Sequence, residues 1–421
     1  MSAYAAVADS RAVDIGLWAE AGLALCLFLL PPLLALAPRG AAPLAAVAGL
    51  FAFISMLAQP GRRAAALSLP AVLLGALIVW GGLSALWSLD PGRSLLLAAR
   101  LCGLFAAGLA LATASGGIRA PHRLRLALAA GTTLGIALAL ADLASAGGLS
   151  RYVSARPFIA PRLNQEAAWV ALLLLPIVVL LFARFRLPAL AAAAALTAAV
   201  FALDDTTAKL ALAASLPVAA LFYLRRTAAA RVAAALAALA ILTAPVTLPR
   251  LARLPGVFAA ADAVKSSAGH RLLIWSFAGD RIAERPFLGW GLDSARAIPG
   301  GKDEIRPGQS WLPLHPHDGA IQVWLELGAP GAALMALFVG WLWLSLGDAA
   351  WPPAYAAAAA GSLTAALLVA ASGWGLWEEW WIGTLELAMF AITALAPLAA
   401  PIPRRPHGWR AGGRSGRAAA S

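Results

Sequence analysis

The sequence predicts an all-α, polytopic integral membrane protein with about twelve transmembrane helices. Of its 421 residues, 62% are hydrophobic and only 12% are charged, whereas an ordinary soluble domain has about 25% charged residues. The mean hydropathy is +0.80 over the whole chain, so the apolar residues are spread along it rather than gathered in one anchor. This composition excludes a water-soluble fold.

Twelve apolar runs come close to the roughly 20 residues that cross the hydrocarbon core of a bilayer. They cover residues 15–37, 41–58, 67–88, 94–115, 123–146, 164–183, 188–204, 206–224, 230–248, 319–346, 351–372 and 374–397. Asp204 and Asp205 interrupt the apolar stretch between the seventh and eighth runs and predict a tight turn. No internal repeat relates the two halves, and the long polar insertion at 249–318 has no counterpart in the first half.

The distribution of arginines predicts the orientation of the chain. Most loops after even-numbered runs are rich in arginine, as is the tail at 398–421, and basic loops stay on the cytoplasmic face. We therefore expect a basic cytoplasmic tail and an external, periplasmic loop at 249–318. The net charge of +12 follows from this bias, so no nucleic-acid partner is expected. Cys26 and Cys102 lie inside apolar runs, which predicts neither a disulfide framework nor a thiolate metal site.

The long loop contains a predicted amphipathic helix that begins at a capping serine, Ser266, and ends near Glu284, before Pro286. Arg271 and Trp275 are four residues apart and share one face of it. This helix could lie on the membrane surface with its arginines solvated. Alternatively, the planar guanidinium of Arg271 could bind a phosphate group.

The sequence His315-Pro316-His317-Asp318 stands where the loop returns to the membrane. Two histidines and an aspartate could bind a metal, one histidine could act as a general base, or the group could be structural. No other His-rich or Cys-containing element on the same side supplies a further ligand, so a metal site is the less favoured of these alternatives.

Several ionisable residues lie inside or at the edge of the apolar runs: Arg100, Lys209, Glu326, Glu378 and Glu379. Charged groups are costly in hydrocarbon and usually face a cavity, a partner or a lipid headgroup. Lys209 is near enough to the end of its run to reach the interface. Arg100 and Glu326 are deeper and are the better functional candidates.

Three stretches carry a resemblance: GHRLLIW at 269–275 with IAERPFLGWG at 282–291, HPHD at 315–318 with WLELGAPG at 324–331, and WEEWW at 377–381. In this order around a late loop, they resemble the O-antigen ligase and O-antigen polymerase family of bacterial membrane glycosyltransferases. The second stretch has the spacing of a histidine, a small polar residue, nine residues and Gly-x-x-Gly. Asp318 stands where the family more often has Asn, Ser or Gln, and His270 where Asn is common.

The resemblance implies a GT-C-like fold in the bacterial inner membrane, with an active site that faces the periplasm. It further implies a metal-independent, cofactor-free and inverting transfer of a glycan from an undecaprenyl-pyrophosphate donor to an acceptor hydroxyl, with lipid A-core as the expected acceptor. The expected partners also include the membrane lipids around the chain. The family places the general base on His317 and pyrophosphate contacts on Arg271, with Arg100 and Arg162 as weaker candidates. Supporting roles go to Trp275, Glu326 and His315.

Two alternatives to a ligase stay open at this point. A polymerase of the same family would use another lipid-linked repeat as the acceptor. A twelve-span secondary transporter belongs to a different class, but such transporters usually have two related halves.

Overall fold

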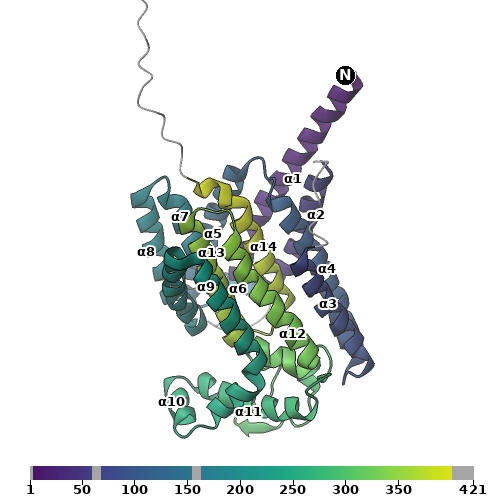
Figure 1. The fold of residues 1–421 in the computed structure, drawn as a ribbon. Helices are drawn as coiled ribbons and strands as arrows, with labels where there is room; N and C mark the ends of the chain where they lie inside the picture. The colour runs from purple at the N-terminus through teal and green to yellow at the C-terminus, as the bar shows by residue number, and fades with distance from the viewer. Residues whose placement is uncertain (1–2, 59–67, 154–162, 401–421) are drawn as a thin grey trace, which may run out of the picture.

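The structure is a computed structural model that describes residues 3–58, 68–153 and 163–400. It is a bundle of long helices, closed at one end by the segment between α9 and α12, which contains α10, α11 and a short hairpin of β1 and β2 (Figure 1). We call this end the loop end. The elements are α1 (Ala3–Leu36), α2 (Ala41–Leu57), α3 (Leu69–Leu83), α4 (Pro91–Ser115), α5 (Pro121–Ala144), α6 (Ser150–Val153), α7 (Asn164–Phe182), α8 (Arg186–Ala202), α9 (Thr206–Ala252), α10 (Val257–Val264), α11 (Ser266–Glu284), β1 (Glu304–Arg306), β2 (Gln309–Ser310), α12 (Gly319–Asp348), α13 (Pro353–Ser372) and α14 (Glu379–Leu395).

The predicted all-α membrane class is confirmed. Within the described residues, ten helices are long and apolar enough to cross a membrane, and α8 is a shorter apolar helix of 17 residues. The sequence predicted about twelve spans. The difference comes from α8, which is short, and from α9, whose 47 residues form two helices joined at a bend and cover the predicted runs 206–224 and 230–248.

Helix α9 is bent back on itself at Arg225, where the backbone leaves helical geometry (φ −140°, ψ 47°). Its first half packs beside α13, with Ser215 Oγ donating to the carbonyl oxygen of Gly361 at 2.7 Å. The next residue, Arg226, donates to the carbonyls of Leu346, in the last turn of α12, and Trp351, in the connection from α12 to α13. The bend therefore lies beside that connection, away from the loop end.

The second half of α9 then returns along α12. A Cβ at Gly347 would lie 2.8 Å from Ala230, and farther along, Trp324 Nε1 donates to the carbonyl oxygen of Ile241 at 2.8 Å. Since residue numbers rise along α9 while they fall along α12, this half runs back towards the loop end. The predicted pair of spans is thus present as an antiparallel hairpin, without the separate loop expected between residues 224 and 230.

Aspartates cap three helices that enter the bundle from the loop end, α4, α9 and α12. Asp90 accepts a hydrogen bond from the backbone N–H of Arg93 at 3.1 Å, Asp205 accepts from Thr207 and Ala208, and Asp318 accepts from Ile321 at 2.8 Å. Each side chain satisfies N–H groups that have no partner within the first turn of a helix. The tight turn predicted at Asp204 and Asp205 is confirmed, because α8 ends at Ala202 and α9 begins at Thr206.

Helix α11 has the predicted bounds, from Ser266 to Glu284, but the predicted serine cap is wrong. The residue before the helix is Lys265, and no side chain caps the first turn. The apolar face of α11 packs inside the protein, against the loop and α12, with a core that includes Ile274, Ala278 and Ile282. This packing argues against a helix that rests its apolar face on lipid.

A glycine divides α12 near the loop end. Gly328 has φ +63°, and a Cβ there would lie 2.3 Å from the carbonyl oxygen of Phe287. Only glycine allows this conformation and this approach at little cost. The break exposes backbone groups on either side, and the chain at 286–291 satisfies them: the N–H groups of Trp290 and Gly291 donate to the carbonyls of Leu325 and Glu326, respectively.

Candidate active site

His315 and His317 lie in the turn that leads into α12, with ring centroids 4.2 Å apart. The backbone N–H of His317 donates to Nδ1 of His315 at 3.2 Å, and Nδ1 of His317 lies 2.8 Å from the carbonyl oxygen of Gly373. His317 has φ +55°, which is unusual for a residue with a side chain. The two contacts hold the ring in this conformation.

These hydrogen bonds assign the protons of the two neutral rings. A carbonyl oxygen can only accept, so Nδ1 of His317 carries the proton and Nε2 carries the lone pair. His315 Nδ1 accepts from a backbone N–H, so its proton is on Nε2. His317 therefore presents an acceptor nitrogen, and His315 presents a donor.

Burial keeps both histidines neutral. It lowers the pKa of His315 to about 3, with further lowering by His317 and by two nearby arginines, Arg296 and Arg271. Burial also lowers the pKa of His317, although the hydrogen bond to Gly373 opposes the shift. At pH 7 the Nε2 atom of His317 can therefore accept a proton.

Arg271 projects from α11 towards this turn. It is half-buried, and it makes no hydrogen bond or ion pair with any residue that the structure describes. Burial lowers its pKa, which the carboxylate of Asp205 opposes. A guanidinium remains charged in proteins, and burying it without a partner is costly. Arg271 is thus a cation free to bind an anion beside the two histidines.

Two other predicted residues hold this arrangement together. Trp275, one turn after Arg271, donates its indole N–H to the carbonyl oxygen of Pro316 at 3.1 Å. Asp318 caps α12, and burial raises its pKa to about 6, while hydrogen bonds from backbone N–H groups oppose the rise. Trp275 thus ties α11 to the histidine turn, and Asp318 fixes the start of the helix that follows.

Glu326 is fully buried at the break in α12 and joins three segments. Its Oε2 accepts from the backbone N–H of Asp293 and from Trp377 Nε1, both at 2.7 Å, and its Oε1 accepts from Gln322 Nε2 at 3.3 Å. Glu326 therefore connects α12 to the segments around Asp293 and Trp377 and does not face the histidine turn with a free oxygen.

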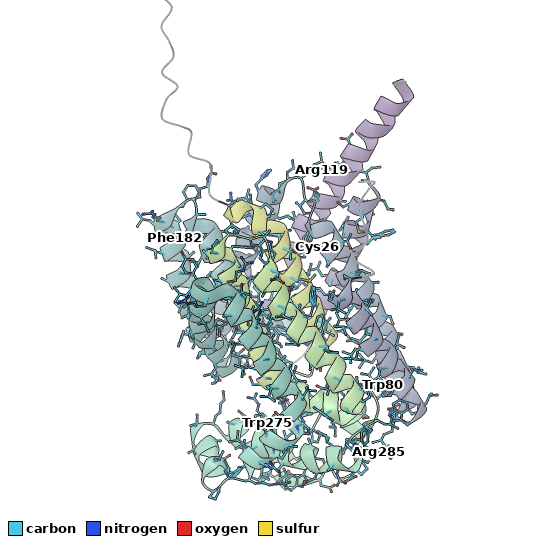
Figure 2. All side chains as sticks on the ribbon, viewed as in Figure 1. Cys26, Trp80, Arg119, Phe182, Trp275 and Arg285 are labelled. Atoms are coloured by element: carbon cyan, nitrogen blue, oxygen red, sulfur yellow. The ribbon has the colours of Figure 1, made fainter. Side chains whose placement is uncertain are left out.

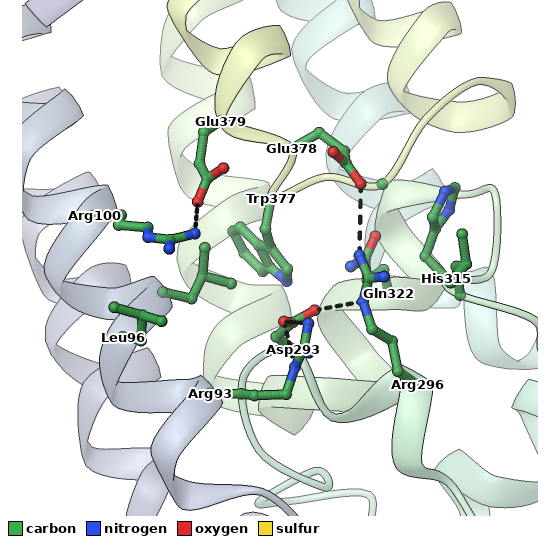
Figure 3. A pocket seen from close by; sticks show the side chains of 13 residues that line it. Arg93, Leu96, Arg100, Asp293, Arg296, His315, Gln322, Trp377, Glu378 and Glu379 are labelled. Atoms are coloured by element: carbon green, nitrogen blue, oxygen red, sulfur yellow. Dashed lines mark hydrogen bonds and ion pairs between the residues drawn. The ribbon is translucent and has the colours of Figure 1, made fainter. Parts of the chain in front are cut away.

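A cavity of about 270 Å³ lies beside the turn, between α4, the segment at 293–296 and the start of α14, with His315 in its wall (Figure 3). Six of its lining residues are charged: Arg93, Arg100, Arg296, Asp293, Glu378 and Glu379. Arg100, predicted as a phosphate ligand, pairs with Glu379 at 2.9 Å. Burial raises the pKa of the Glu378 carboxyl, which the charge of Arg296 opposes.

The structure brings Arg271, Trp275, His315 and His317 to one place, with Trp275 at the loop end of the molecule (Figure 2). Arg100 lines the adjoining cavity, and Arg162 lies outside the described residues. Sequence reasoning missed Arg93, Asp293 and Arg296. Helical spacing could have found the first, because residues 93, 96, 97 and 100 recur at i, i+3, i+4 and i+7 and all line the cavity.

The part of the chain that contains this site is similar to known proteins. A family model described as O-antigen ligase matches residues 190–336, which include Arg271 and His317. A candidate polysaccharide ligase of Rickettsia conorii is 44% identical over 81 residues, covering 18% of this chain and 20% of the relative. Another, of Rickettsia prowazekii, is 33% identical over 128 residues, covering 28% and 30%. The matched part thus spans less than a third of these relatives. The resemblance seen in the sequence is confirmed, and over residues 190–336 this multi-pass membrane protein is similar to the O-antigen ligase family.

Proposed function

We propose that this chain is a membrane glycosyltransferase that transfers a glycan from undecaprenyl pyrophosphate to a hydroxyl group on lipid A-core. One observation carries the proposal most directly. Nδ1 of His317 lies 2.8 Å from the carbonyl oxygen of Gly373, which places the proton there and leaves the Nε2 lone pair for a base, and burial lowers the pKa of this histidine. Arg271 lies nearby and makes no hydrogen bond or ion pair with the described residues. A base and an anion-binding group are the two requirements of this reaction.

In the proposed mechanism, the acceptor oxygen attacks the anomeric carbon of the donor sugar. The acceptor O–H proton passes to Nε2 of His317. The bond between the anomeric carbon and the pyrophosphate oxygen breaks, and its electron pair stays on the departing pyrophosphate. Arg271 stabilises that growing negative charge through the two parallel N–H groups of its guanidinium. A single displacement of this kind inverts the anomeric centre and requires no metal.

The proposed site is on the external face of the bacterial inner membrane, with the segment 249–318 in the periplasm and the basic tail 398–421 in the cytoplasm. The arginine distribution supports this orientation, and so does the chemistry, because the histidine turn lies where α12 enters the bundle from the loop end. A lipid-linked donor and an external acceptor could meet there.

Deletion of the gene tests the reaction. Cells that lack a ligase should accumulate long polymer on the lipid carrier and carry lipid A-core without glycan. Cells that lack a polymerase should instead attach single repeats to lipid A-core. Unchanged glycosylation with altered uptake or export of a solute would refute both activities and favour a transporter.

A further inference from the structure

The cavity beside the histidine turn has a balanced set of charges. Each of its three arginines has a carboxylate partner in the wall: Arg93 pairs with Asp293 at 2.7 Å, Arg100 with Glu379 at 2.9 Å, and Arg296 with Glu378 at 3.7 Å. Figure 3 shows these side chains around one space. Three cations and three carboxylates leave the wall without a net charge when all six are ionised.

This balance makes the cavity a poor site for a diphosphate. The guanidinium groups are already neutralised, and carboxylates in the same wall repel a phosphate group. Arg271 differs, since it makes no hydrogen bond or ion pair with the described residues, although the charge of Asp205 acts on it. The diphosphate therefore belongs beside Arg271, and Arg100 serves another ligand.

The lining suits the hydroxyl groups of a sugar. Every hydroxyl can both donate and accept a hydrogen bond, and here guanidinium donors alternate with carboxylate acceptors. Trp377 also lines the cavity, and its ring is held in place because its N–H donates to Glu326. An aromatic ring next to polar groups offers one apolar surface to a sugar ring.

The size and position of the cavity limit what it can hold. About 270 Å³ is near the lower end of small-molecule sites, which range from about 300 to 1,000 Å³. It suits a single sugar unit rather than a chain of them. His315 lines the cavity and its ring centroid is 4.2 Å from that of His317, so a bound sugar would lie next to the proposed base.

We propose that this cavity is a subsite for one uncharged sugar unit of a transferase substrate. The proposal rests on the proposed function and deepens it. The sugar could be the acceptor unit that supplies the attacking hydroxyl, or the donor unit attached to the diphosphate. Both present the same polyhydroxylated chemistry to the wall, and binding measurements with separate probes distinguish them.

The test uses the full chain in lipid nanodiscs and the double variant Arg100→Gln/Glu379→Gln, which removes one ion pair without changing the net charge. A second variant, Leu96→Trp, fills the cavity from an exposed position on α4 and leaves the ion pairs in place. A matched control, Arg253→Gln/Asp280→Asn, removes an exposed ion pair of 2.7 Å outside the cavity. Thermal unfolding checks that each variant is folded.

Three probes are compared by direct binding: undecaprenyl pyrophosphate without sugar, the lipid-linked glycan isolated from cells that lack this chain, and lipid A-core from the same cells. Both cavity variants should bind the sugarless diphosphate as the wild type does. Each should bind one sugar-bearing probe about tenfold more weakly or worse, because the double variant loses hydrogen bonds to charged groups and the larger side chain of Leu96→Trp occupies the space of the sugar. Weaker binding of lipid A-core identifies the acceptor sugar, and weaker binding of the lipid-linked glycan alone identifies the donor sugar.

Two results would overturn the subsite. One is a loss of sugarless diphosphate binding in the folded cavity variants, which would make the cavity the diphosphate site. The other is unchanged binding of all three probes. Failure of the proposed function looks different: Arg271→Ala would then keep its affinity for the sugarless diphosphate, whatever the cavity variants do.

Discussion

The indole N–H of Trp275 donates to the carbonyl oxygen of Pro316 at 3.1 Å, so α11 and the histidine turn are fastened to each other one helical turn from Arg271. Residues 269–275 and 315–318 are separated by about 40 residues of loop, yet this contact fixes the proposed anion-binding group relative to the proposed base. Trp275 is therefore a positioning residue.

Replacing Trp275 by Phe keeps most of the ring but removes the donor. One neutral hydrogen bond contributes about 1 kcal/mol, so we expect kcat to fall about fivefold or more through misplacement of the turn, with little change in the KM of the donor. Steady-state transfer assays separate the two constants. An equal loss in the variant Trp324→Phe, which breaks a similar bond to Ile241 away from the histidines, would show that the effect is only structural.

Arg271 should be essential for transfer but dispensable for folding. Arg271→Ala should abolish transfer, and Arg271→Lys should recover little because an ammonium cannot form the bidentate contact of a guanidinium. Since Arg271 has no ion pair among the described residues, its removal should not lower the melting temperature.

The variant Arg226→Ala provides the contrast. Arg226 donates to the carbonyls of Leu346, Ala349 and Trp351, so its loss should lower the melting temperature. The transfer rate of each folded Arg226→Ala molecule should equal that of the wild type. Full activity in Arg271→Lys would reduce the role of Arg271 to bulk charge.

The orientation of the chain is tested by cysteine labelling, after Cys26 and Cys102 have been replaced by serine. Lys302 is exposed in the segment 249–318, and Arg123 is exposed near the start of α5. A membrane-impermeant maleimide should label Lys302→Cys in intact spheroplasts and Arg123→Cys only after lysis. The reverse pattern would invert the proposed topology.

The parts of this protein that follow local rules could be predicted from its sequence. The bounds of α11 follow from its amphipathic period and from Pro286, and the turn at Asp204 and Asp205 follows from two polar residues in an apolar stretch. The serine cap was wrong because Ser266 is the first helical residue rather than the one before it.

The site depends on contacts between distant segments, which local patterns do not encode. Asp293 looks like an ordinary loop residue, but its backbone N–H binds Glu326 and its carboxylate binds Arg93, 200 residues away in the sequence. The reversal near Arg225 was predicted as a gap between the runs 206–224 and 230–248, but its form was not, since one non-helical residue takes the place of the expected loop. Arg100 was found for its depth in an apolar run, but its partner Glu379 could not be inferred.

Chelation tests the absence of a catalytic metal. No group of three or more potential His, Cys, Asp or Glu ligands comes together within residues 3–58, 68–153 and 163–400. In the proposed mechanism Arg271 supplies the positive charge that a metal would otherwise provide. Purified enzyme treated with EDTA should therefore retain its full transfer rate. Loss of activity that a divalent ion restores would contradict the assignment of His317 as a metal-free base.

The pH dependence of transfer tests His317 as the general base. The base works when neutral, and burial lowers its pKa below the ordinary value of about 6.5. Transfer measured as kcat/KM should therefore be constant around neutral pH and fall as the pH drops through the lowered pKa, with a midpoint below pH 6.5. His315 should not contribute to this acidic limb of the pH profile, because its pKa is about 3.

The variant His317→Ala should lose about 10² to 10⁴ in rate, the usual contribution of a general base. Its residual activity should not fall at acidic pH, so that the acidic limb is absent. The exposed His122, at the start of α5, provides the matched control: His122→Ala should keep both the rate and the limb. An acidic limb that persists in His317→Ala would assign the base to another group.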